Sequence, residues 1–155
     1  MKNNLLIYTL VSTLIVLNLN ADKKVSSGVN SMLQKAQESV KVISTKKFYE
    51  MVEEDEDFIQ LDVRENNENG HGEIFSLEKV KLTRGYIEYK VERSLEDKDS
   101  KIIVVCCSGK RAVLAAKTLQ EMGYTDVSYL KGGVRGWLQD GYPLDTVYGE
   151  LFLAK

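Results

Sequence analysis

Three short stretches of the chain are dominated by apolar residues and predict buried strands. Residues 101–105 end in four β-branched residues in a row, a composition typical of a strand covered on both faces. Residues 58–64 and 127–130 are apolar runs of similar length. Runs of this length that are bounded by turn residues indicate strands rather than helices, so we expect the three segments to share one sheet.

Apolar residues at helical spacing predict helices between these strands. The first helix covers residues 29–40, and the second begins after Ser44, whose side chain can cap it. A third helix spans residues 112–122, and a short fourth helix carries Trp137. Helices that alternate with strands predict an α/β fold with a mostly parallel central sheet flanked by helices. In such a sheet, functional sites lie at the carboxyl ends of the strands.

The two ends of the chain differ from its centre. Residues 1–21 contain one positive charge and then an apolar run that is too short to span a membrane, and they predict a secretory signal. The signal is either cleaved after Ala21 or kept as an N-terminal membrane anchor. Residues 22–42 are expected to form a helical extension, residues 43–145 one domain, and residues 146–155 a tail. The protein is therefore expected to be exported, with a periplasmic location.

Charged residues are mixed along the chain rather than gathered in blocks. The chain has 21 basic and 23 acidic side chains, and no basic cluster suited to a phosphate backbone, which argues against nucleic-acid binding. The acidic residues 53–57 indicate a solvated loop rather than a cation site. One histidine, His71, and two cysteines are too few for a zinc site. We expect His71 to be structural, and no metal or cofactor is predicted.

The two cysteines, Cys106 and Cys107, are neighbours in the chain. Consecutive Cα atoms lie about 3.8 Å apart, which is below the roughly 4.4–6.8 Å that a disulfide usually spans. A bond between them would be strained and easily reduced. At least one free thiol is therefore expected, and a free thiol in an exported protein indicates a thiol that works in the reaction.

Cys106 directly follows the strongest predicted strand and precedes a loop that leads into a helix. Backbone N–H groups of such a loop, at Ser108 and Gly109, can point inward and hold an anion. The helix N-terminus and the side chains of Lys110 and Arg111 add positive potential. These features favour a thiolate at Cys106, the attacking form in sulfur exchange. Lys110 either draws anions toward the loop or simply faces solvent.

The segment from Cys106 to Arg111 resembles the active-site loop of single-domain rhodaneses, Cys-x-Ser-Gly-x-Arg. Other motifs of that family occur in the same order and spacing: Leu61-Asp62-Val63-Arg64-Glu65, Ala115-Ala116-Lys117-Thr118-Leu119, Gly123-Tyr124 and Leu130-Lys131-Gly132-Gly133-Val134-Arg135-Gly136-Trp137. The resemblance covers residues 43–145. It implies a rhodanese-like α/β fold and transfer of sulfane sulfur through a cysteine persulfide. The stretch 74–84 departs from the family pattern and leaves the donor open.

The resemblance also implies roles for the loop residues. Cys106 would attack the outer sulfur of thiosulfate or polysulfide and hold it as a persulfide, with Ser108 and Gly109 as backbone donors. A thiol, cyanide or a protein acceptor would then remove the sulfur. Arg111 either orients the anionic donor or forms a salt bridge that holds the loop. Cys107 is either a passive small residue or a second thiol that resolves the persulfide.

Outside the loop, the resemblance implies that Asp62 and Arg64 brace the site from the neighbouring strand, and that Trp137 packs in the core. Two other functions stay open: a periplasmic carrier that passes polysulfide sulfur to a respiratory enzyme, and a cysteine phosphatase or arsenate reductase. Four residues separate Cys106 from Arg111, whereas the phosphatase pattern has five, so the spacing favours sulfur. A homodimer is a further open alternative.

Overall fold

The computed structural model describes residues 27–153, and the chain separates into two compact units, residues 1–35 and 36–155. Residues 27–39 are helical. Within the described range, no helix combines the length and the apolar character that a membrane span needs. The predicted signal or anchor at residues 1–21 lies outside the described residues.

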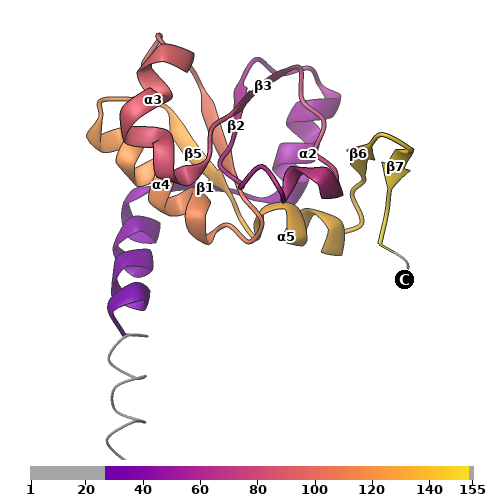
Figure 1. The fold of residues 1–155 in the computed structure, drawn as a ribbon, viewed down its shortest axis with the longest axis horizontal. Helices are drawn as coiled ribbons and strands as arrows, with labels where there is room; N and C mark the ends of the chain where they lie inside the picture. The colour runs from indigo at the N-terminus through magenta and orange to yellow at the C-terminus, as the bar shows by residue number, and fades with distance from the viewer. Residues whose placement is uncertain (1–26, 154–155) are drawn as a thin grey trace, which may run out of the picture. The chain divides into compact units, whose positions relative to one another are not determined.

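Five parallel strands form the central sheet of the second unit (Figure 1). Their order across the sheet is β1 (Lys41–Ile43), β5 (Val127–Leu130), β4 (Ile102–Val105), β2 (Ile59–Asp62) and β3 (Glu78–Lys81). The central strand β4 is buried at every position, as its β-branched sequence predicts. The predicted α/β fold with a parallel sheet is confirmed.

Helices cover the sheet on both faces (Figure 1). The α-helices are α2 (Thr45–Glu53), α3 (Ile87–Ser94), α4 (Lys110–Glu121) and α5 (Gly133–Gln139), and two short 3₁₀ helices are η1 (Asn69–His71) and η2 (Arg84–Tyr86). Helix α2 begins where the sequence predicts, because the Ser44 hydroxyl accepts a hydrogen bond from the Lys47 N–H at 3.1 Å. Helices α2 and α5 pack together on one face, and α3 and α4 pack together on the other.

The core between the sheet and the α2–α5 face is rich in aromatic residues. Phe48 lies edge-on to Trp137 with ring centroids 5.6 Å apart, and Trp137 packs on Tyr142 at 4.7 Å. The Trp137 indole N–H donates to the Pro143 carbonyl at 2.6 Å, so its polar group is satisfied while the ring is buried. Trp137 is therefore a core residue, and it anchors helix α5.

Two strands lie where the sequence gave no strand signal. Residues 41–43 form β1, although the helical extension was predicted to run to residue 42. Residues 78–81 form β3, in a region for which we assigned no element. Both strands lie at the edges of the sheet and contain exposed lysines, so neither shows the continuous apolar run of a central strand.

The C-terminal part of the chain contains a hairpin, which begins at Leu144 and continues into the segment 146–155 that we named a tail. Strands β6 (Leu144–Thr146) and β7 (Gly149–Leu151) pair in antiparallel fashion. Glu73 and Asp145 exchange two backbone hydrogen bonds, at 2.9 and 2.8 Å, which tie the hairpin to the segment that precedes β3. The hairpin is thus held on the domain by Leu144, which is buried, and by this bridge.

Candidate active site

Cys106 lies directly after the central strand β4, at the carboxyl end of the sheet. Its Sγ accepts two backbone hydrogen bonds, from the Gly109 N–H at 3.1 Å and from the Ala112 N–H at 3.3 Å. The first donor belongs to the loop and the second to the first turn of α4. The side chain has no solvent-exposed surface. The sulfur is therefore enclosed by the loop, and the amide groups around it are suited to a negative charge.

Two glycines allow the loop to take this shape. Gly109 caps α4 with a φ of +82°, a conformation that residues with a Cβ rarely adopt. Gly133 has a φ of +58°, and a Cβ at that position would lie 2.1 Å from the Cys106 carbonyl oxygen. The first turn of α5 can therefore approach the cysteines closely. The N–H groups of Val134 and Arg135 donate to the carbonyls of Cys106 and Cys107, both at 2.9 Å.

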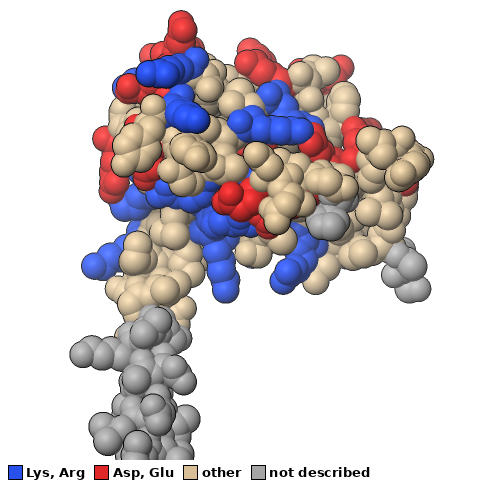
Figure 2. All heavy atoms as spheres, viewed as in Figure 1, with Lys and Arg blue, Asp and Glu red and all other residues tan. Residues whose placement is uncertain are grey.

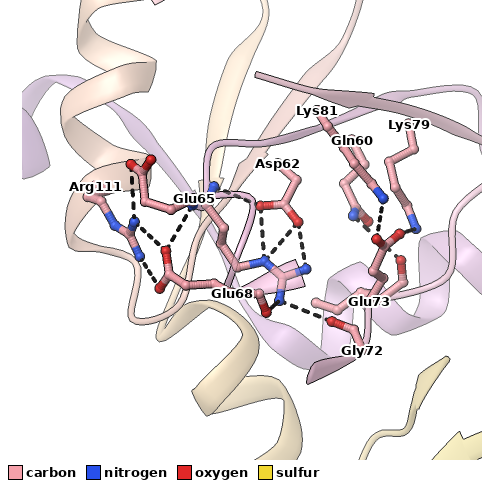
Figure 3. A network of polar contacts seen from close by, with 11 residues as sticks. Gln60, Asp62, Glu65, Glu68, Gly72, Glu73, Lys79, Lys81 and Arg111 are labelled. Carbon is pink, nitrogen blue, oxygen red and sulfur yellow. Dashed lines mark hydrogen bonds and ion pairs between the residues drawn. The ribbon is translucent and has the colours of Figure 1, made fainter. Parts of the chain in front are cut away.

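Arg111 is engaged in an ion pair rather than left open toward the loop (Figure 3). Its two terminal nitrogens each lie 2.6 Å from an oxygen of Glu68, and Glu65 lies 3.8 Å away. Hydrogen bonds from Arg111 lower the pKa of Glu68 from 4.5 to about 2. The same hydrogen bonds, together with attraction from Cys106 and Glu65, raise the pKa of Arg111. The guanidinium charge is thus largely balanced by carboxylates.

Asp62 and Arg64 form a second, fully buried ion pair with an N–O distance of 2.7 Å. Arg64 also donates to the Gly72 carbonyl at 3.0 Å and to the Glu68 carbonyl at 3.5 Å. These contacts hold together residues 62–72, the first part of the connection between β2 and β3 (Figure 3). Glu68 is the ion-pair partner of Arg111. The buried pair of Asp62 and Arg64 therefore positions the carboxylate that holds the Cys106 loop through Arg111.

The other predicted loop residues lie on the outer side of the site. Cys107 and Ser108 are partly exposed, and Lys110 is exposed and forms no ion pair within the described chain. Lys110 is therefore the cation of the loop whose charge stays unbalanced. The side chain of His71 lies outside the described part of the structure. Among the described residues, no group of three metal-binding side chains comes together.

Three contributors to the site were not identified from the sequence. Glu68 pairs with Arg111 across 43 residues of sequence, and only the pattern of an acidic residue near an Asp-x-Arg strand hints at it. The second amide donor, that of Ala112, depends on where α4 begins. The close approach of Gly133 requires the three-dimensional packing of α5 on the loop.

A sulfur atom held by backbone N–H groups at the end of a parallel strand can attack a sulfane sulfur and retain it as a persulfide. Sulfur exchange at Cys106 is the chemistry that this arrangement supports. Fold and site together define the class as a cysteine-based sulfurtransferase.

The comparison with known families agrees with this class. The model of the rhodanese-like domain matches residues 44–140, and the chain belongs to this family. It is a rhodanese-type sulfurtransferase with a single rhodanese-like domain in the matched region.

Similar proteins whose names describe sulfur transfer support the assignment to this family. The chain is 36% identical over 98 residues to YtwF of Bacillus subtilis, whose name describes a sulfurtransferase, and this covers 63% of the chain and 90% of YtwF. It is 30% identical over 113 residues to the thiosulfate sulfurtransferase GlpE of Haemophilus influenzae, covering 71% of the chain and 99% of GlpE. Among solved structures, the polysulfide-sulfur transferase homodimer of Wolinella succinogenes matches with a TM-score of 0.66 and 26% identity, covering 85% of this chain and 93% of that one.

Proposed function

We propose that the protein moves sulfane sulfur from thiosulfate or polysulfide to a thiophilic acceptor through a persulfide on Cys106. The observation that carries this proposal is the pair of amide hydrogen bonds on the Cys106 sulfur, at 3.1 and 3.3 Å. Preorganised N–H donors stabilise negative charge, which both the attacking thiolate and the persulfide carry. The names of the Haemophilus and Wolinella proteins support thiosulfate and polysulfide, respectively, as donors.

The proposed reaction is a double displacement. The Cys106 thiolate attacks the outer sulfur of thiosulfate, a bond forms between the two sulfurs, and the old S–S bond breaks. Sulfite leaves with the electron pair of that bond. In the second half, an acceptor nucleophile attacks the outer sulfur of the persulfide, and the Cys106 thiolate is regenerated. No outside oxidant or reductant is consumed, because the sulfane sulfur keeps its oxidation state.

The ion pair between Arg111 and Glu68 supports the bracing role of Arg111 over direct donor binding. A guanidinium whose charge is balanced at 2.6 Å attracts a dianion weakly. Lys110 then supplies the positive charge that guides the donor to the loop, while Ser108 and Gly109 present their backbone amides. Asp62 and Arg64 act through Glu68, as positioning residues.

Mass spectrometry of the protein after incubation with thiosulfate tests the proposal directly. We expect a gain of one or more sulfur atoms on the wild type and on Cys107→Ser, and none on Cys106→Ser. A gain on Cys106→Ser that is lost on Cys107→Ser would assign the nucleophile to Cys107. Equal gain on all three proteins would overturn the persulfide mechanism. So would the absence of any gain on the wild type, both with thiosulfate and in a parallel incubation with polysulfide.

A sulfur carrier is the second candidate function, because the Wolinella protein is named as a polysulfide-sulfur transferase. An enzyme turns over thiosulfate with cyanide many times, whereas a carrier loads from polysulfide and releases its sulfur only to its protein partner. Steady-state rates with each donor, measured with cyanide as the common acceptor, separate the two functions.

We also propose that the protein is exported and that it forms a homodimer. The charge and apolar pattern of residues 1–21 supports export. The homodimeric state of the Wolinella protein supports the assembly. Cell fractionation with mass determination of the mature chain tests the first, and light scattering tests the second. A protein found in the cytosol with residues 1–21 intact, or a mass equal to one chain, would refute them.

A further inference from the structure

A pocket of about 470 Å³ opens beside the active-site loop. Its walls come from the loop, from helix α5 and from the C-terminal hairpin. The residues that line it include Cys107, Arg135, Leu138, Leu144, Leu151 and Leu153. The volume falls within the range of about 300–1,000 Å³ that small-molecule sites occupy.

The far wall of the pocket is apolar and is supplied by the hairpin. Leu151 and Leu153 line it although they are 45% and 52% exposed, whereas Phe152 between them does not. This alternation is that of an extended chain, which directs every second side chain to the same side. The hairpin region also presents a mostly uncharged surface in Figure 2. Such a surface suits the apolar part of a ligand.

The near wall is polar and adjoins the reactive loop. Cys107 is one of the lining residues, and its carbonyl accepts the Arg135 N–H at 2.9 Å. The Arg135 side chain is exposed and forms no ion pair with any described residue. The other charged lining residues, Arg64 and Glu68, are already paired with Asp62 and Arg111. Arg135 is therefore the charge in this pocket that can receive an anionic ligand.

The hairpin wall lies outside the part of the chain that the family model matches. The rhodanese-like match covers residues 44–140, and the residues that close the pocket, from Leu144 to Leu153, follow it. The pocket therefore takes one wall from outside the matched region, and its lining residues differ from the Gly109 and Ala112 amides that hold the Cys106 sulfur.

We propose that this pocket binds the sulfur acceptor, and that the acceptor is a thiol on an apolar chain that also carries an anionic group. This inference rests on the proposed persulfide chemistry. The acceptor thiolate attacks the outer sulfur of the Cys106 persulfide, and a new S–S bond forms on the acceptor. The bond to Cys106 Sγ breaks, its electron pair returns to Cys106 as thiolate, and the thiol proton of the acceptor passes to solvent.

The test compares two acceptors on protein loaded with thiosulfate, with loading verified by mass. We expect the KM for 8-mercaptooctanoate to be at least about tenfold lower than that for 3-mercaptopropanoate, because the longer chain buries more methylene groups. The double variant Leu151→Ala, Leu153→Ala should lose this preference. The matched variant Tyr148→Ala, Phe152→Ala, which removes exposed apolar side chains of the same hairpin outside the pocket, should keep it.

A further variant tests the anionic part of the proposal. Arg135→Gln should raise the KM for 8-mercaptooctanoate several-fold and leave that for 8-mercaptooctanol unchanged. Equal KM values for long and short thiols on the wild type would overturn the inference, as would a hairpin shown by hydrogen exchange to be covered by a second copy of the chain. Failure to load sulfur at all would instead count against the proposed function.

Discussion

The Cys106 loop and the β6–β7 hairpin border the same region of the molecule but are built in opposite ways. In the loop, the sulfur is buried, its amide donors are engaged, and Arg111 is paired with Glu68. In the hairpin, Val147 and Tyr148 are 92% and 98% exposed. The contacts of the loop therefore hold it in one conformation, whereas the tip of the hairpin is expected to tolerate substitution without loss of sulfur loading on Cys106. The reactive thiol is thus held in a fixed environment, and the choice of sulfur acceptor can depend on the neighbouring hairpin.

The largest expected effect comes from removing the reactive sulfur itself. Cys106→Ser should lower sulfur transfer by at least about a thousandfold, because Cys106 is the thiol whose sulfur accepts the loop amide hydrogen bonds. Cys107→Ser should retain activity within about threefold, since that side chain accepts neither of the amide hydrogen bonds. Steady-state rates with thiosulfate and cyanide measure both. Comparable losses in the two variants would contradict the distinction between them.

A smaller but still large effect is expected from the glycine that lets α5 approach the loop. Gly133→Ala places a Cβ against the Cys106 carbonyl at a positive φ, and should cost about 3 kcal/mol of stability. Gly141→Ala is the matched control, because Gly141 has a φ of +89° but nothing within 4 Å of a Cβ. It should cost only about 1 kcal/mol. Urea unfolding measures the difference, and equal losses would show that packing on the loop is unimportant.

The pair between Glu68 and Arg111 should give an intermediate effect that depends on pH. Its partly exposed geometry makes Glu68→Gln cost about 1–2 kcal/mol at pH 7. The lowered pKa of Glu68, about 2 against 4.5, means that the folded state binds fewer protons than the unfolded state between these values. Stability from this group is therefore present above about pH 4.5 and is lost as the pH falls toward 2.

Unfolding at a series of pH values checks this prediction. Wild type and Glu68→Gln should differ at pH 7 and converge as the pH falls to about 2. Glu92→Gln removes the exposed pair with Lys98 and should change stability less than Glu68→Gln does, with no change between pH 7 and the acid range in which Glu68 titrates. A pH-independent difference between wild type and Glu68→Gln would mean that the pair does not supply the stability assigned to it.

The smallest effect is expected at the tip of the hairpin. Tyr148→Ser should leave stability within about 0.5 kcal/mol and loading with sulfur unchanged, because the ring is almost fully exposed. Thermal unfolding and the mass gain with thiosulfate measure the two quantities. A large loss of either would show that the hairpin is not the variable region that the comparison describes.

Much of the fold could be predicted from the sequence, because the apolar pattern of the central strands matches their burial on both faces of the sheet. Ile102–Val105 and Val127–Leu130 are covered on both faces, so their apolar runs are continuous. The edge strands Lys41–Ile43 and Glu78–Lys81 are three and four residues long and half exposed, and they gave no periodic signal. Their position is set by pairing with β5 and β2, which is a tertiary property.

The residues of the site also fall into two groups: those within the Cys106 loop and those that contact the loop from elsewhere in the chain. The Cys106 loop, including Gly109 and Arg111, is one continuous segment, so the chemistry proposed for it could be inferred from the sequence alone. Glu68 and Gly133 act on that segment from elsewhere in the chain, through an ion pair and through a close backbone approach. Contacts of this kind leave no periodic trace in the sequence, and for that reason the partner of Arg111 was not predicted.

The complete enclosure of the Cys106 sulfur also has a consequence for reagents that modify thiols. A side chain without solvent-exposed surface is expected to react slowly with bulky alkylating compounds. The partly exposed neighbour, Cys107, meets such compounds first. Brief labelling of the folded protein with such a compound should therefore modify Cys107 before Cys106.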